Sequence, residues 1–228
     1  MIKIYKIIIL SIIIIFPLLA KAHVQHYANL NQIEFDIYRN DNHIGKHIFT
    51  FNRSEENLSV KSEINFEIKK FGVVLYKYKA TGTEVFKDGK LIKFNSETNQ
   101  NKKLKYVNIE LVNDNEYKID GSSFKGKVPT DYLLGTWWNH SIVKAPAQIS
   151  AVSGRIIKQK VKFIGKEELK INGKVYNTLH FNFSSSDKSL SKSKKLNTDV
   201  WYDEESLNWV KASFEKKGKW EYRLIGIK

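Results

Sequence analysis

Apolar and polar residues alternate along most of this chain, and that two-residue period restricts the fold more than any other feature of the sequence. In residues 58–68 every second side chain is apolar or small, and the residues between them are polar or charged. The first set is Leu58, Val60, Ser62, Ile64, Phe66 and Ile68. Successive side chains of a β-strand point to opposite faces of its sheet, so this run predicts a strand with one buried face. The sequence therefore predicts an all-β protein.

Similar runs lie on both sides of this one, with turn residues between them. We expect strands over residues 33–38, 43–51, 58–68, 73–86, 91–97, 104–112, 116–119, 156–171, 174–183, 198–202, 207–214 and 219–225. Asp88-Gly89 and Asn172-Gly173 predict type I′ hairpin turns, and Gly45 indicates a bulge where the alternation breaks. Many strands joined by close turns favour an antiparallel barrel or a strongly curved sheet over an α/β fold.

The alternation stops in residues 130–153, here called the central connector. This segment contains two adjacent tryptophans, Trp137 and Trp138, followed by Asn139 and His140. Asp131 stands at an N-cap position, and apolar residues recur near helical spacing up to residue 143. We therefore expect a short helix or an irregular loop that lies across one mouth of the barrel.

Residues 1–22 have the pattern of a cleavable secretory signal peptide. Lys3 and Lys6 precede an apolar run that is about half of the roughly 20 residues needed to span a bilayer. Ala20-Lys21-Ala22 is the small-x-small triplet that precedes a cleavage site, and an uncut signal anchor is the alternative. We expect cleavage after Ala22, a periplasmic or secreted protein, and no transmembrane segment in the mature chain.

The mature chain is expected to form a single β-barrel-like domain over residues 23–228. Residues 184–196 are rich in serine and lysine and contain few apolar side chains, so they predict a mobile surface loop. The oligomeric state is left open by the sequence.

The chain has a formal charge of +14 and no cysteine. Loss of Lys3, Lys6 and Lys21 with the signal peptide lowers the charge to +11. A basic exported protein is suited to an anionic lipid or glycan surface of the envelope, although abundant Ile, Asn and Lys also fit an A/T-rich coding bias. Export disfavours nucleic acid as a partner. The lack of cysteine excludes disulfides, thiol chemistry and Cys-ligated metals.

His140 is the candidate catalytic residue, as part of an acid/base pair with Asp203 or Asp131 beside Ser141. However, no serine lies in a Gly-x-Ser-x-Gly elbow, and the sequence has no P-loop or dinucleotide fingerprint. A terminal His23 would chelate copper only together with a second histidine. No other histidine stands at a sequence spacing that identifies it as this second ligand. We therefore expect no cofactor and no metal site. A non-enzymatic protein is favoured, and an envelope hydrolase that uses His140 and Asp203 is the alternative.

Aromatic residues favour ligand binding as the function class. Trp201, Trp209 and Trp220 recur on predicted C-terminal strands, where a cross-strand core cluster is the ordinary interpretation and a sugar- or acyl-binding surface is the alternative. Any cavity in the fold is expected beneath the central connector. Its expected lining is Tyr132, Trp137, Trp138, His140 and Trp201.

Motifs in the second half of the chain resemble those of a known family. They are Thr136-Trp137-Trp138-Asn139-His140, Ser153-Gly154, Lys166, Asn172-Gly173, Asp199-Val200-Trp201-Tyr202-Asp203 and Tyr222-Arg223-Leu224. The pattern resembles an exported bacterial domain-of-unknown-function family that has a Trp-Asn central segment and a Val-Trp-Tyr-Asp C-terminal strand. The resemblance covers most of residues 30–226, and Trp137 departs from the Tyr or Phe expected at its position.

The resemblance implies a β-barrel or half-barrel that is broadly similar to periplasmic carriers of lipids or lipoproteins, and it implies no activity. Combined with the apolar faces of the predicted strands, it favours an exported domain that binds an apolar or amphipathic envelope ligand, such as a lipid or acyl chain. A purely structural or partner-binding envelope protein is a further alternative.

Overall fold

The computed structural model describes residue 27 and residues 29–228, so the predicted signal peptide, its cleavage site and His23 lie outside the described residues. The described chain folds as a single large sheet. Its strands are β1 (Gln32–Arg39), β2 (Asn42–Arg53), β3 (Asn57–Lys70), β4 (Val73–Lys87), β5 (Lys90–Gln100), β6 (Lys103–Asn113), β7 (Glu116–Gly121), β8 (Lys125–Pro129), β9 (Leu133–Leu134), β10 (Ala147–Ile149), β11 (Ile156–Ile171), β12 (Lys174–Ser185), β13 (Asn197–Asp203), β14 (Trp209–Glu215) and β15 (Lys219–Ile227).

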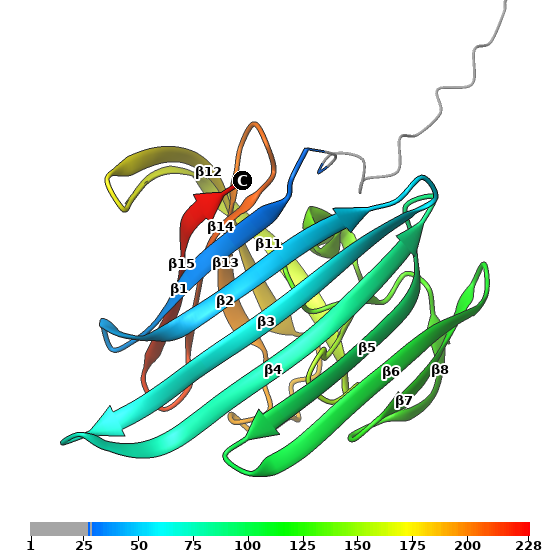
Figure 1. Cartoon of the computed structure of the whole chain (residues 1–228), viewed down its shortest axis with the longest axis horizontal. Coiled ribbons are helices and arrows are strands. Elements are labelled where there is room, and N and C mark those ends of the chain that lie inside the picture. The colour runs from blue at the N-terminus through cyan, green and yellow to red at the C-terminus, as the bar shows by residue number, and fades with distance from the viewer. Residues whose placement is uncertain (1–26, 28) are drawn as a thin grey trace, which may run out of the picture.

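The sheet is strongly curved but does not close into a barrel. Its hydrogen-bonded order is β8-β7-β6-β5-β4-β3-β2-β1-β15-β14-β13-β12-β11-β10-β9. Neighbouring strands are antiparallel except β9 and β10, which pair in parallel. Figure 1 shows strands β1–β6 as a broad layer, with β11–β14 behind it. The predicted all-β, strongly curved sheet is therefore confirmed.

Every predicted strand is present, with its ends extended or shifted by a few residues. The Asp88-Gly89 and Asn172-Gly173 turns have positive φ at both residues, as type I′ turns require. Gly45 lies where the register between β1 and β2 shifts, and a Cβ atom there would stand 2.1 Å from the Asn65 carbonyl oxygen. Backbone crowding thus explains this glycine at the predicted bulge.

Three short strands, β8, β9 and β10, were not predicted. They lack alternation: β8 is Lys-Gly-Lys-Val-Pro, and all three residues of β10 are buried. For residues 130 to 143 the sequence predicts a short helix or an irregular loop, and the structure has a mostly irregular segment there. The connector contains β9, a 3₁₀ helix at His140–Lys144 and β10, and Asn139 rather than Asp131 caps the helix by accepting a bond from Ser141 N.

One hydrophobic core joins both halves of the sheet to the central connector. Phe49 of β2, Ile109 of β6, Trp138 of the connector, Tyr202 of β13 and Trp209 of β14 are all fully buried within it. A smaller cluster of Ile37, Phe66 and Tyr78 forms a row across β1, β3 and β4, in which Gly45 is the β2 member between Ile37 and Phe66. The connector is therefore part of the core rather than a cover laid over an empty interior.

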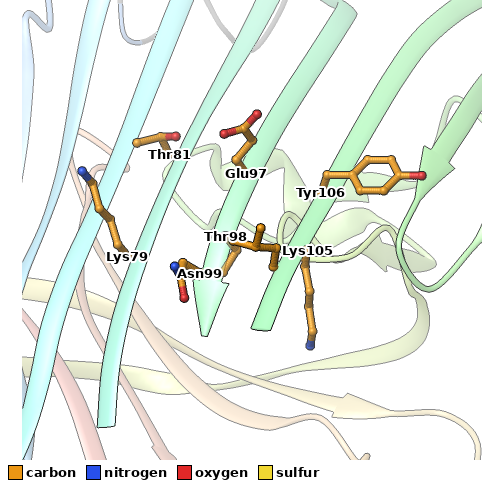
Figure 2. A pocket seen from close by; sticks show the side chains of 8 residues that line it. Lys79, Thr81, Glu97, Thr98, Asn99, Lys105 and Tyr106 are labelled. Carbon is orange, nitrogen blue, oxygen red and sulfur yellow. The ribbon is translucent and has the colours of Figure 1, made fainter. Parts of the chain in front are cut away.

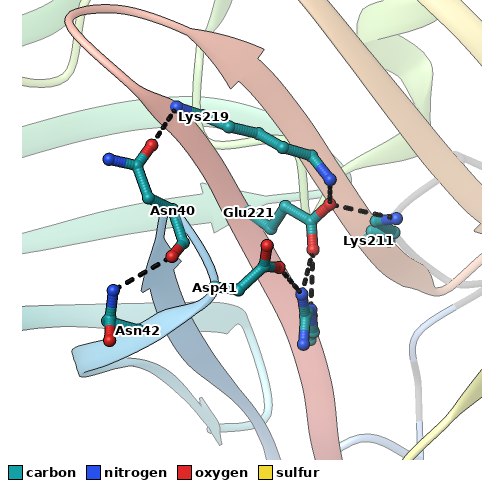
Figure 3. A network of polar contacts seen from close by, with 7 residues as sticks. Asn40, Asp41, Asn42, Lys211, Lys219 and Glu221 are labelled. Atoms are coloured by element: carbon teal, nitrogen blue, oxygen red, sulfur yellow. Dashed lines mark hydrogen bonds and ion pairs between the residues drawn. The ribbon is translucent and has the colours of Figure 1, made fainter.

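A polar network ties the β1–β2 turn to β15 (Figure 3). The side chain of Asn40 accepts a bond from Lys219 N, and Arg223 contacts Asp41 at 3.1 Å. Glu221 is 5% exposed and contacts both Lys219 and Arg223. Burial alone would raise the pKa of Glu221, but these cations outweigh it and lower the pKa to about 2. The network fixes the end of the sheet from which the β3–β4 hairpin extends.

Candidate functional site

Trp138 is the anchor of the central connector. Its ring is 0% exposed and makes edge-to-face contacts with Tyr27, Phe51 and Phe86 at centroid distances of 5.4, 5.3 and 5.7 Å. Edge-to-face aromatic pairs contribute about 0.5–1.5 kcal/mol each beyond the area that they bury. Trp138 therefore holds the connector against β2 and β4.

The indole N–H of Trp138 donates a 2.8 Å bond to Oε1 of Glu84 on β4. This carboxyl group is 3% exposed and also bonds Thr136. Burial raises the pKa of Glu84 to about 7, and the bonds from Trp138 and Thr136 offset only part of the increase. The alternation of β4 predicts neither this inward-facing acid nor its partner, because Glu84 stands where an apolar residue would be expected.

Trp137 has an unusual backbone conformation for its size, with φ of 60°. Such a conformation costs roughly 1–2 kcal/mol for a residue with a Cβ atom. Its ring packs against Trp209 and Tyr222, and its carbonyl accepts a bond from the Tyr202 hydroxyl. Its buried indole N–H has no hydrogen-bond partner among the described residues. An oxygen atom of a water or ligand would satisfy that donor.

His140 lies in an aromatic corner formed by β12 and β13. Its ring meets Tyr202 edge-on at 4.7 Å and Phe181 at 5.8 Å. Its backbone N–H donates to the hydroxyl of Tyr27. Phe181 in turn contacts Phe163 of β11 at 5.3 Å. A path of aromatic rings therefore leads from the core outward to β11.

The structure places Asp203 on the other side of β13 from His140. Tyr202 faces the core and contacts His140, and the next side chain of a strand points to the opposite face. Asp203 accepts bonds from the backbone and hydroxyl of Ser206, and it lines a surface pocket of about 670 Å3 together with Tyr176. The geometry does not bring the predicted acid/base pair together. Asp131, the other acid considered, is exposed.

Trp201 also lies away from the connector. It stacks on His180 at 4.2 Å, and the amino group of Lys211 lies 4.9 Å from its ring centroid. His180 bridges Glu167 and Asp199 at 2.9 and 3.0 Å. The tryptophans predicted as one cluster are thus divided. Trp201 packs among these polar and charged side chains on the outer face of the sheet, and Trp209 packs in the core.

Tyr132 is half-buried and packs against the main core. Trp138 contacts Tyr27, whose hydroxyl accepts a bond from His140 N, and Tyr202 contacts both the Trp137 carbonyl and the His140 ring. A ligand-binding role stays a prediction for Tyr132, Trp137, Trp138, His140 and Trp201.

A strip of apolar side chains on β11 and β12 was missed by the sequence reasoning. Val161 and Phe181 pack against the core, whereas Phe163 and Ile164 are 49% and 47% exposed. We call Val161, Phe163, Ile164 and Phe181 the β11 strip. The available signal was the adjacent pair Phe163-Ile164, which interrupts a lysine-rich alternating run; the structure shows a register shift there between β11 and β12.

The outer edge of β11 is largely unpaired in the described chain. Strand β10 pairs with it only from Ile156 to Lys158, and Gln159 N donates to Pro146 O. From Lys160 to Ile171 no described strand continues the sheet on that side. The β11 strip therefore lies beside an unpaired strand edge.

A shallow pocket of about 610 Å3 lies on the outer face of β4, β5 and β6 (Figure 2). Lys79, Thr81, Glu97 and Tyr106 project from adjacent strands around it. Its lining combines polar and charged side chains with Leu104 and Tyr106, and it shares no residue with the aromatic path from His140. Within residues 27 and 29–228, no helix is long and apolar enough to cross a bilayer.

The family model for a domain of unknown function, DUF6134, matches residues 35–225. The chain belongs to the DUF6134 family. This match confirms the predicted membership of a domain-of-unknown-function family with barrel-like relatives. A comparison with curated proteins finds no match.

The DUF6134 chain is similar in fold to a solved β-barrel-like protein of the domain of unknown function DUF1849 from Brucella abortus. The TM-score is 0.61 at 10% identity, covering 86% of this chain and 96% of that chain. A putative exported protein with a YmcC-like fold from Bacteroides fragilis gives a TM-score of 0.36 at 10% identity, covering 86% and 94%. A DUF1329 family protein from Desulfovibrio piger gives 0.28 at 11% identity, covering 91% and 90%.

Proposed function

We propose that this protein is an exported, non-enzymatic binder of an amphipathic lipid in the cell envelope. The observation that carries the proposal is the β11 strip, where half-exposed apolar side chains lie beside an unpaired strand edge and continue into the aromatic corner of His140. An acyl chain on the strip would cover Phe163 and Ile164 without displacing the core. Removing apolar surface from water contributes about 25 cal/mol per Å2.

Two further features support this proposal. The buried N–H of Trp137 is a donor that an oxygen of a lipid headgroup would satisfy. Of the residues expected to line the site, His140 and Trp137 contact Tyr202, which contacts Phe181 of the strip.

The compartment belongs to the proposal as well. Residues 1–22 have the pattern of a signal peptide, and without Lys3, Lys6 and Lys21 the mature chain carries a formal charge of +11. A periplasmic or secreted protein with this charge would be attracted to anionic headgroups, by about 1 kcal/mol for each lysine or arginine near the surface. Periplasmic fractionation with mass spectrometry of the N-terminus tests the compartment and the cut after Ala22.

Titration with a fluorescent fatty acid, below its micelle concentration, tests the binding site. Phe163→Ser and Ile164→Ser should each weaken binding about tenfold, the equivalent of one lost apolar side chain contact. Val112→Ser is the matched control, because Val112 is also half-exposed, at 48%. It lies on β6, and β6 and β11 are toward opposite ends of the strand order of the sheet. Equal affinity of all three variants and the parent would rule out the strip as the site.

The unpaired edge of β11 favours a second candidate function, the binding of an extended segment of a partner protein. Unpaired backbone groups on an edge strand are a template for another strand. The lysines of β11, which include Lys160, Lys162 and Lys166, would select an acidic segment. Amide hydrogen exchange distinguishes the two: a pairing strand protects backbone amides from Lys160 to Ile171, whereas an acyl chain covers side chains and leaves most of those amides exchanging.

A further inference from the structure

We propose that the tip of the β3–β4 hairpin docks this protein on an anionic lipid bilayer. The proposal rests on the envelope location given under the proposed function, but it concerns a different surface from the β11 strip. It commits to a membrane surface as the occupant.

The tip extends beyond the rest of the sheet. Strand β2 pairs with β3 only as far as Phe66, opposite Gly45, and β5 pairs with β4 only as far as Tyr78, opposite Gln100. Residues 67–76 therefore form a two-stranded projection with no further strand of the described chain beside it. At about 3.3 Å per residue, the five residues from 67 to 71 project about 16 Å. Figure 1 shows this hairpin reaching past its neighbours at the lower left.

The end of the projection is apolar and exposed. Phe71 is 94% exposed in the turn, and Val73, Val74 and Leu75 are 61%, 46% and 55% exposed. We call these four residues the docking tip. Single exposed apolar residues are ordinary on protein surfaces, but a group of four on a projecting turn marks an interaction surface.

Lysines surround the docking tip. Lys69, Lys70, Lys77 and Lys79 flank it, and Glu67 is the single acid of residues 67–79. Both Lys69 and Lys77 contact Glu67, and the amino group of Lys70 lies 5.5 Å from the Phe71 ring centroid. Long lysine side chains can keep their ammonium groups among headgroups while an apolar turn enters the boundary with the acyl chains. This charge complementarity identifies an anionic bilayer as the occupant.

A second turn at the same end of the sheet has the same character. Strands β3–β6 are successive antiparallel neighbours, so the β3–β4 and β5–β6 turns lie at one end, as Figure 1 shows along the lower edge. Leu104, the second residue of β6 after this turn, is 79% exposed and follows Lys102 and Lys103. Both turns can therefore face one bilayer surface.

Co-sedimentation with phosphatidylcholine vesicles, with and without phosphatidylglycerol, tests the proposal. The protein should bind only the anionic vesicles, and added salt should release it because the attraction is screened. Phe71→Ser should reduce partitioning about tenfold. Leu75→Ser should act in the same direction. Val175→Ser is the matched control, because Val175 is 50% exposed on the hairpin at the opposite end and should leave partitioning unchanged.

Phe71→Trp adds a direct readout of insertion, since the indole emission should shift to the blue on anionic vesicles. Absence of vesicle binding, or equal binding by parent and Phe71→Ser, would overturn the proposal. Loss of self-association in Phe71→Ser without any vesicle binding would also overturn it, in favour of a second copy as the occupant. Titration of the Phe71→Ser variant with the monomeric fluorescent fatty acid separates this outcome from failure of the proposed function.

Discussion

The buried carboxyl group of Glu84 should make the stability of this protein fall as the pH rises. A rise of the pKa from 4.5 to about 7 corresponds to about 3 kcal/mol between the neutral and ionised folded forms. Because the folded pKa lies above the unfolded one, this stabilisation is fully present below about pH 4.5 and is lost as the pH rises through about 7. Above that pH the ionised carboxylate of Glu84 stays buried among aromatic rings. The hydrogen bonds from Trp138 and Thr136 offset only part of the cost of burying this charge.

Glu84→Gln removes the charge and keeps an acceptor for the indole N–H of Trp138. The free energy of unfolding of Glu84→Gln minus that of the parent should increase by about 3 kcal/mol between pH about 4.5 and pH about 8, because only the parent loses this stabilisation. Urea unfolding followed by tryptophan fluorescence measures this difference, in which all other titrating groups cancel.

Glu84→Leu separates the charge from the hydrogen bond. It should also lose the pH dependence, but it should be less stable than Glu84→Gln at every pH, by about 1–3 kcal/mol, because the Trp138 N–H is left unsatisfied. A difference between Glu84→Gln and the parent that does not change with pH would refute the reasoning.

Two other positions give predictions of opposite kinds. His47 is buried among aromatic rings, and burial lowers its pKa to about 3, so the stability that it contributes is present above about pH 6.5 and is lost as the pH falls toward about 3. Urea titrations give the free energy of unfolding of His47→Phe and of the parent. The value for His47→Phe minus that for the parent should be about 3 kcal/mol larger at pH about 4 than at pH about 7. Gly45→Ala should destabilise the protein by about 2 kcal/mol or more, because its Cβ would meet the Asn65 carbonyl at 2.1 Å; a melting temperature equal to that of the parent would contradict this account of the bulge.

The strands could be predicted from the sequence because their side chains face two different environments in alternation. Residues 156–171 give the bounds of β11 directly, since lysines recur at every second position from Lys158 to Lys162 and polar residues continue up to the Asn172-Gly173 turn. The β8, β9 and β10 strands have no such contrast: β10 is buried on every residue, and β9 is only two residues long. Their pairing depends on the position of the connector, which is a tertiary property.

The candidate site was only partly predictable for a related reason. Trp137, Trp138 and His140 are consecutive or nearly so, and their deviation from alternation indicates a connector across one mouth of the sheet but not the full burial of Trp138 in the core. Trp201 and Tyr202 are neighbours in sequence but face opposite sides of β13, so composition alone does not indicate that Trp201 stacks on His180 while Tyr202 contacts His140. The free edge of β11 depends on which strand ends the sheet, and no local pattern encodes that.

Photo-crosslinking with a diazirine-labelled fatty acid tests the central claim most directly. The reacted protein is digested, and the labelled peptides are identified by mass spectrometry. The account predicts adducts on residues 156–171 and 174–185, centred on Phe163, Ile164 and Phe181, that are lost in Phe163→Ser. Adducts confined to the outer pocket around Tyr106, or a complete absence of adducts, would contradict it.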